Sequence, residues 1–245
     1  MKQKIIAIGG GDFKSYKTLS IDQEIVKFSE HKQPNFLFIP TASTDHAGYS
    51  ATIMEHFKVL GCQVDVLNLI NKKLSLEEIT HKILHAHIIY VGGGNTLKMM
   101  TLWRKLGVDI LLEKARRKGT VLCGISAGSI CWFNYGNSDS RKDKNPGADY
   151  IKVRGLGFLD AFNCPHYDSE LGRKESLKMM MRKQSGIALA LDDCAALQVH
   201  GDTYRIIRSS ENACAYKVYW KNGVFFEEKI DFIDTFQSLK LLFKK

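Results

Sequence analysis

Short apolar runs alternate with longer amphipathic stretches through the first half of the chain, and this alternation is the strongest constraint on its fold. The runs that predict strands are Lys4 to Ile8, Asn35 to Ile39, Gln63 to Leu67, His87 to Val91 and Thr120 to Gly124. The stretches that predict helices are Ile21 to Glu30, Tyr49 to Leu60, Leu76 to Leu84 and Thr96 to Lys118, the last broken near Gly107. Because parallel strands need crossover connections, we expect an α/β fold: a mostly parallel sheet sandwiched by helices.

From Gly186 onward the predicted strands are short and closely spaced. They are Gly186 to Leu191, Ala195 to His200, Thr203 to Arg208, Ala213 to Trp220 and Val224 to Glu228. The Gly201-Asp202 and Asn222-Gly223 pairs between them predict hairpin turns. We therefore expect antiparallel C-terminal strands that extend the same sheet. No repeat or linker divides the chain, so residues 1–245 are predicted to form a single domain, whose most loop-like stretch is Asn137 to Asp149.

The composition excludes several classes of protein. With 44% hydrophobic and 25% charged residues, the 245-residue chain has the composition of a globular protein that builds its core without disulfides. Its six cysteines form no CxxC pair, which favours buried thiols, and no cluster has metal-ligand spacing, so we expect no metal and no cofactor. The N-terminus lacks a signal peptide, and no apolar run approaches the roughly 20 residues that span a bilayer. We expect a cytoplasmic protein that does not enter a membrane.

The net charge of +9, from 35 Lys+Arg and 26 Asp+Glu, raises the question of a polyanionic partner. The chain has no RNP-like aromatic motif, no zinc-finger spacing and no basic helix, so we expect no nucleic-acid binding. Much of the charge lies on scattered helix-face lysines and on the Lys240 to Lys245 end. We interpret it as aiding solubility, with a modest bias toward acidic peptides. The oligomeric state stays open, a homodimer included.

One strand-to-helix turn carries a reactive residue type. The sequence Gly124-Ile125-Ser126-Ala127-Gly128 follows a predicted strand and precedes an apolar helix start. A serine on such a sharp turn has an exposed hydroxyl, and the flanking glycines avoid collisions with neighbouring backbone. Ser126 is therefore the candidate nucleophile. The alternative interpretation is a Gly-rich turn in which Ser126 only caps the following helix.

A serine nucleophile needs a base, and His166 is the best placed of the eight histidines. It follows the short apolar segment Gly157 to Phe162, and Pro165 stiffens the backbone before it, so the ring can be held in one position. His46, after a strand-end loop, also stays open. The other six histidines are typical of solvated surface, strand ends and turns.

An oxyanion hole needs backbone N–H groups aimed at one point, and Gly92-Gly93-Gly94-Asn95 at a strand end is a natural source. The amides of this turn are placed to act with that of Ala127. The alternatives are anion binding at a helix N-terminus and a simple tight turn. Neither glycine run has the spacing of a dinucleotide fingerprint or a P-loop, which disfavours nucleotide binding.

Six segments, in order, resemble the dipeptidase E-like serine peptidases of peptidase family S51, which include aspartyl dipeptidases and cyanophycinases. The segments cover about the first 195 residues: Ile5 to Gly11, Phe38 to Ser43, Tyr90 to Thr96, Gly124 to Gly128, Pro165 to Asp168 and Ile187 to Asp193. The resemblance implies a class I glutamine-amidotransferase-like (flavodoxin-like) fold with serine in place of the usual cysteine.

The resemblance also implies residue roles. Ser126 would be the nucleophile and His166 the general base, with an oxyanion hole formed by Gly93, Gly94 and Ala127. For the third triad member, which orients the histidine and stabilises its charged form, the dipeptidases point to Asp139, shortly after the nucleophile helix. Two further aspartates remain alternatives for this role: Asp168 and Asp192.

The implied activity is hydrolysis of short peptides, including dipeptides with an N-terminal aspartate, through an acyl-enzyme. The partner is then a small peptide substrate. We assign Asn95 and Arg173 as substrate-binding residues, because a bidentate arginine suits a substrate carboxylate; Arg173 also reads as an ordinary first-turn helix residue. The alternatives are a cyanophycinase-like hydrolase of β-aspartyl-arginine linkages and a catalytically silent, ligand-binding member of the fold.

Overall fold

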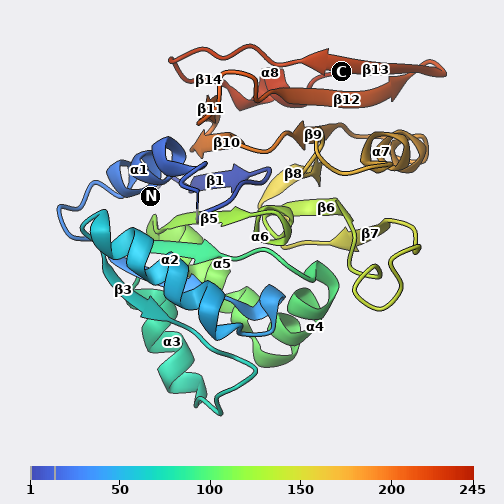
Figure 1. Cartoon of the computed structure of the whole chain (residues 1–245). Helices are drawn as coiled ribbons and strands as arrows, with labels where there is room; N and C mark the ends of the chain where they lie inside the picture. Colours follow the sequence, from blue (N-terminus) through green and yellow to red (C-terminus); the bar gives the residue numbers. More distant parts are fainter. Residues whose placement is uncertain (1, 14) are drawn as a thin grey trace.

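Two sheets form the framework of the protein, whose computed structural model describes residues 2–13 and 15–245 (Figure 1). The first sheet has the strand order β14-β11-β10-β1-β5-β4-β2-β3. Its parallel strands are β1 (Lys4–Ile8), β5 (Val121–Ile125), β4 (Ile88–Val91), β2 (Asn35–Ile39) and β3 (Gln63–Val66). Antiparallel strands continue it beyond β1: β10 (Ala195–His200), β11 (Thr203–Arg208) and β14 (Gln237–Ser238). The predicted parallel sheet is confirmed.

Helices cover both faces of this sheet, because alternate residues of each buried strand point to opposite sides. Ile6 and Ile8 of β1 pack in the cluster that includes α1 (Leu19–Phe28) and α2 (Ala47–Val59). Ile5 and Ala7 belong to the cluster on the other face, with α3 (Leu76–His85), α4 (Thr96–Leu106) and α5 (Val108–Lys118). Gly107 separates α4 from α5 in a left-handed conformation (φ 72°), so the predicted helix break is confirmed.

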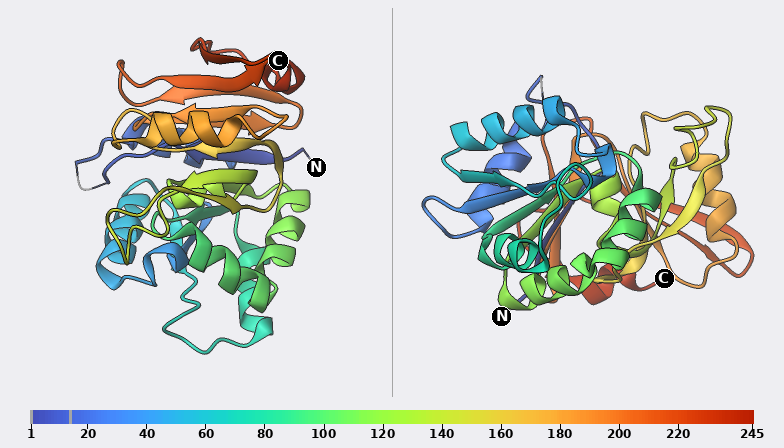
Figure 2. Two further views of the ribbon diagram at one scale, coloured as in Figure 1. Left: turned by 90° about the vertical axis from the view of Figure 1, so that its right-hand side faces the viewer. Right: turned by 90° about the horizontal axis from the view of Figure 1, so that it is seen from below.

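The second sheet was not expected. Its order is β13-β12-β9-β8-β6-β7. The strands are β13 (Val224–Lys229), β12 (Ala215–Lys221), β9 (Ala188–Leu191), β8 (Leu159–Cys164), β6 (Phe133–Ser138) and β7 (Ile151–Arg154). The prediction that all C-terminal strands extend the first sheet is therefore wrong: β10, β11 and β14 do so, whereas β9, β12 and β13 join strands from the middle of the chain. Figure 2 shows the yellow and orange strands of this sheet beside the first.

Apolar side chains of the two sheets pack in one common core. The largest cluster of buried apolar side chains includes Val91 of the first sheet, Leu189 of the second and Trp132 between them. The helix α7 (Arg173–Met181) connects β8 to β9 and buries Leu177 and Met181 on the second sheet, and a short helix, α8 (Leu239–Phe243), ends the chain. All six cysteines are buried and free, as predicted. Among the described residues, no helix has the length and apolar character needed to cross a membrane.

Candidate active site

Ser126 lies on a strained turn at the carboxyl end of β5. Its backbone has φ 56° and ψ −116°, a conformation that non-glycine residues rarely adopt. Its amide donates to the carbonyl of Ile8 at 3.1 Å, which fixes the turn against β1. Ser126 occupies the N-cap position of the following helix, α6 (Ala127–Ile130), but its side chain makes no capping hydrogen bond, so the hydroxyl is not used as a cap. The helix has only four residues, fewer than expected, and contributes little dipole.

The glycines on either side of Ser126 are needed for close backbone packing, as predicted. A Cβ atom on Gly124 would overlap the carbonyl of Gly128, and one on Gly128 would overlap the carbonyl of Val91 in β4. These two contacts press α6 onto the ends of β5 and β4. The position of the Ser126 hydroxyl is therefore set by backbone contacts on both sides of the turn.

His166 pairs with Asp193, and the pair stands at the ends of two neighbouring strands. His166 follows β8 with a φ of 51°, Asp193 follows β9, and the ring Nδ1 lies 2.6 Å from Asp193 Oδ1. Gly10, just beyond β1, forms an isolated bridge with Asp193, and a Cβ atom on it would overlap both members of the pair. The ends of β1, β8 and β9 thus hold the imidazole and its carboxylate together.

Asp193 is held as an anion. Its amide donates to Asp168 Oδ1 at 2.9 Å, and its carboxylate also accepts a hydrogen bond from Ser169. Burial acts to raise the pKa of Asp193, but the hydrogen bond and charge of His166 outweigh it and hold that pKa below its usual value. An ionised carboxylate at Nδ1 keeps the ring proton there and leaves Nε2 as the free acceptor.

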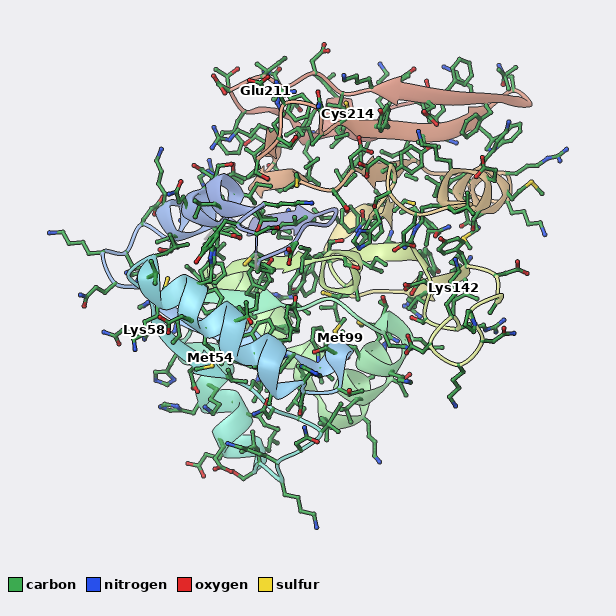
Figure 3. The ribbon with its side chains drawn as sticks, viewed as in Figure 1. Met54, Lys58, Met99, Lys142, Glu211 and Cys214 are labelled. Carbon is green, nitrogen blue, oxygen red and sulfur yellow. The ribbon has the colours of Figure 1, made fainter. Side chains whose placement is uncertain are left out.

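The expected third triad member, Asp139, is not the carboxylate at the His166 ring. It follows β6 in a loop whose Ser140 and Asp143 contact the start of α4, and Lys142 marks this loop in Figure 3. The expectation fails because β6 leads the chain into the second sheet and toward α4.

The two alternatives, Asp168 and Asp192, lie beside the His166–Asp193 pair without replacing Asp193. Asp168 accepts the Asp193 amide, and Asp192 Oδ2 accepts the amide of Cys214 at 3.0 Å. Burial, reinforced by the charge of Asp168, raises the pKa of Asp192 to about 6. Asp193 was missed although its neighbour was selected, because sequence alone does not say which of two adjacent aspartates faces the histidine.

A cavity of about 480 Å³ opens in front of Ser126 and His166. It is bordered by the loop after β1, the first turns of α2 and the ends of β4 and β5. Its other lining residues are Gly11, Asp12, Phe13, His46, Gly48, Tyr49, Thr52, Gly93 and Ile125. A larger cavity, of about 740 Å³, lies between α4, α5 and the β6–β7 region, and Ser126 and His166 are not among its lining residues. Among residues 2–13 and 15–245, no group of three or more His, Cys, Asp or Glu could hold a metal ion.

His46, which the sequence left open, lies in this cavity as the cap of α2. Its Nδ1 accepts from the amide of Tyr49 at 3.1 Å, so the neutral ring carries its proton on Nε2. The preceding residues Thr44 and Asp45 both have left-handed backbones, with φ 56° and 55°. Asp45 is buried and accepts the amides of Ile70 and Asn71, at 2.6 and 3.1 Å, which anchors this loop. His46 therefore positions the first turn of α2 at the cavity.

The Gly-rich turn after β4 adjoins Ser126. A Cβ atom on Gly93 would lie 3.4 Å from Ser126 Cβ and 3.8 Å from its Oγ, so the backbone of Gly93 faces the reactive hydroxyl. Gly94 has φ 130°, and a Cβ atom there would overlap the carbonyl of Ala42, so this position requires glycine. Ala127 directly follows Ser126 and is buried. The structure thus places Gly93 and Ala127 next to Ser126, whereas Gly94 shapes the turn.

The two expected substrate-binding residues are engaged elsewhere, and neither lines the cavity. Asn95 caps α4 by accepting the amide of Lys98 at 2.9 Å, and its amide group donates to Ser140 O and Asp143 Oδ2, both at 2.7 Å. Arg173 is 1% exposed and donates to Asn137 O at 2.8 Å and Glu170 Oε2 at 2.5 Å. Both assignments are corrected: Asn95 holds the β6–β7 loop on α4, and Arg173 holds the start of α7.

Comparisons with known proteins identify the family of the chain. The sequence profile of Peptidase family S51 matches residues 5–207. An uncharacterized peptidase of Bacillus subtilis (strain 168), YgaJ, is 37% identical over 221 residues, which are 89% of this chain and 92% of that protein. A probable alpha-aspartyl dipeptidase of Drosophila melanogaster is 27% identical over 191 residues, 74% of this chain and 75% of that protein.

Solved structures show the same fold. A peptidase from an acI-B1 Actinobacterium superposes with a TM-score of 0.71 at 17% identity, covering 97% of both chains. A putative peptidase E protein from Listeria monocytogenes EGD-e has a TM-score of 0.64 at 23% identity, covering 86% of this chain and 100% of that one. The fold is that of the S51 peptidases, consistent with the expected class I glutamine-amidotransferase-like architecture. The chain belongs to peptidase family S51.

Proposed function

We propose that this protein is a serine peptidase that hydrolyses short peptides through an acyl-enzyme on Ser126. The observation that carries the proposal is that Ser126, on its strained turn, borders the same cavity as His166, whose far ring nitrogen is held by Asp193. Nucleophile, base and orienting carboxylate recur in this arrangement on unrelated folds of serine hydrolases.

In the proposed reaction, Ser126 Oγ attacks the peptide carbonyl while His166 Nε2 takes its proton. Asp193 stabilises the imidazolium through the hydrogen bond at Nδ1. The amide of Ala127, which directly follows Ser126, donates to the oxygen that becomes negative, and the Gly93 turn lies beside it. His166 then returns the proton to the leaving amine, and water attacks the acyl-enzyme with the same histidine as base.

The cavity suits a short peptide. Its volume of about 480 Å³ is in the range of small-molecule sites. The described lining holds one carboxylate, Asp12, and two imidazoles, His46 and His166, and no lysine or arginine. Because a related protein is named as a probable alpha-aspartyl dipeptidase, dipeptides with N-terminal aspartate are the first substrates to test. Neutral dipeptides and β-aspartyl-arginine dipeptides complete the set.

The test is labelling with a fluorophosphonate, which reacts with activated serines, together with a dipeptide screen. Wild type should be labelled and should hydrolyse at least one dipeptide class, whereas Ser126→Ala and His166→Ala should show neither. Ser20→Ala, at an exposed serine of α1, is the matched control and should behave as wild type. Labelling that persists in Ser126→Ala would falsify the nucleophile assignment. A wild type that is neither labelled nor active would favour the silent, ligand-binding alternative.

A further inference from the structure

We propose that the hydroxyl of Tyr49 donates a hydrogen bond to the oxyanion that forms when Ser126 attacks, and that Tyr49 is therefore a catalytic residue. The inference rests on the proposed serine-peptidase function. The sequence analysis did not select Tyr49, which lies in the first turn of α2 and lines the cavity with Ser126, Gly93 and His166.

The hydroxyl of Tyr49 accepts a hydrogen bond, and its own proton is available to donate to a substrate oxygen. The amide of Gly93 donates to the Tyr49 hydroxyl oxygen at 3.3 Å. Within residues 2–13 and 15–245, no hydrogen-bond acceptor for the Tyr49 hydroxyl proton is found. The Gly93 amide, the expected oxyanion donor, is thus already occupied, and the Tyr49 O–H stands in its place. A hydroxyl that accepts one hydrogen bond becomes a stronger donor in the next.

The hydroxyl is hydrogen-bonded to the glycine that adjoins Ser126. Gly93 faces Ser126, with a Cβ position only 3.8 Å from Ser126 Oγ, and Tyr49 is hydrogen-bonded to that same glycine. A substrate carbonyl at Ser126 would occupy the cavity that Gly93 and Tyr49 also line. In the proposal, the Tyr49 hydroxyl from α2 and the Ala127 amide from the start of α6 act together as the two oxyanion donors.

The phenol ring is fixed before substrate arrives. It packs edge-on against Phe38 with ring centroids 5.4 Å apart, and tilted against Phe13 at 6.5 Å. A Cβ atom on Gly92 would lie 2.8 Å from Tyr49 Cε1, so this glycine makes room for the ring. His46 holds the Tyr49 amide at 3.1 Å. A donor held in place without substrate needs no reorganisation during the reaction.

The protonation state fits a donor. Burial raises the pKa of Tyr49 to about 12, although the Gly93 hydrogen bond acts in the opposite direction. The phenol therefore keeps its proton throughout the neutral range. It stabilises the oxyanion by a hydrogen bond and transfers no proton, so His166 remains the only base that the reaction needs.

The decisive variant is Tyr49→Phe, which removes only the hydroxyl. We expect kcat to fall roughly 10²-fold with KM within about threefold of wild type, since the lost hydrogen bond is made to the transition state. A dipeptide boronic acid forms a tetrahedral adduct on serine, and its affinity for Tyr49→Phe should fall by a similar factor. An uncleavable dipeptide analogue should bind equally well to Ser126→Ala and to the double variant Ser126→Ala with Tyr49→Phe. A purely structural role for the hydroxyl predicts equal loss for both ligands, and that result overturns the proposal.

The matched control is Tyr90→Phe. Tyr90 belongs to the same aromatic cluster, with its ring 5.7 Å from Phe13, and its buried hydroxyl has no partner among the described residues and does not line the cavity. Its kcat should equal that of wild type. Unchanged kcat and boronate affinity in Tyr49→Phe, with wild type active, contradict this inference alone. A wild type that neither hydrolyses dipeptides nor labels at Ser126 contradicts the proposed function instead.

If Tyr49→Phe fails to fold, difluorotyrosine at position 49 keeps the packing and makes the hydroxyl more acidic. A phenol stops donating once it ionises, so the alkaline limb of the kcat profile should move to lower pH in the fluorinated protein. An alkaline limb at the same pH as in wild type contradicts a donor role for Tyr49.

Discussion

Two histidine–aspartate pairs in the protein have similar separations and very different surroundings. His166 Nδ1 lies 2.6 Å from Asp193, and His56 Nε2 lies 2.9 Å from Asp22. The Asp22 side chain is 0% exposed, and its second oxygen has no partner among the described residues. The Asp193 side chain is 33% exposed. Burial raises the pKa of Asp22, whereas the pKa of Asp193 is held below its usual value.

The positions of the pairs in the fold explain the difference. Asp22 is in the first turn of α1 and His56 in the last turn of α2, so their hydrogen bond ties two helices together on one face of the first sheet. His166 and Asp193 stand in turns at strand ends, and the His166 ring borders the cavity that contains Ser126. Both pairs contain a hydrogen-bonded imidazole. The proposed catalytic pair differs from the other in that it stands at strand ends and borders the cavity that contains Ser126.

The largest effect is expected from Asp193→Asn. The amide cannot stabilise the imidazolium and favours the wrong ring tautomer, so kcat/KM for the best dipeptide should fall about 10⁴-fold. Steady-state kinetics measure this, with melting temperature as a check on the fold. The matched control is Asp139→Asn, at the aspartate expected from sequence, which should retain wild-type kinetics. Equal losses in both variants would refute the assignment of Asp193.

A second variant tests whether the strand ends set the geometry of the catalytic pair. In Gly10→Ala, the new methyl group overlaps Asp193 and the His166 ring, so the pair must move, and kcat should fall roughly 10²-fold. The control is Gly186→Ala, where a Cβ atom meets nothing within 4 Å. If Gly10→Ala retains full activity in the dipeptide assay, the close packing of Gly10 is not what holds the pair.

The structural pair should respond in the opposite way. Asp22→Ala leaves a buried imidazole without its partner, and the free energy of unfolding should fall by about 3 kcal/mol, while kcat at a temperature where the protein is folded changes less than about threefold. Urea denaturation gives the stability, and the same samples give the kinetics. Ser20→Ala, which lies on the exposed side of the same helix, should leave both quantities unchanged. A large loss of kcat in Asp22→Ala would show that this pair also serves the reaction.

The parts of the site that the sequence predicted are those fixed by local chemistry. Gly124 and Gly128 around Ser126, and Pro165 before His166, restrict the backbone directly. The short apolar runs of β1 and β2, separated by an amphipathic stretch, predict buried parallel strands. The choice between Asp192 and Asp193 depends instead on how β9 lies between β8 and β12, a pairing between distant segments. Arg173 was misassigned because one of its partners, Asn137, lies in β6 and is distant in sequence, whereas only Glu170 is local.

Asp192 offers the finest test, because it shares the burial of Asp22 and is adjacent to Asp193. Its raised pKa, about 6, means that the folded protein holds this proton more tightly than the unfolded chain. The charge of Asp192 therefore destabilises the fold at a pH above its folded pKa, and this penalty vanishes below the unfolded value near 4.

Asp192→Asn, whose oxygen can still accept the Cys214 amide, should melt higher than wild type at about pH 8, and the difference should shrink to zero toward about pH 4. A difference that stays the same at both pH values would mean that the charge of Asp192 is not the cause. If kcat is also unchanged in this variant, Asp192 is excluded as the carboxylate that the reaction requires.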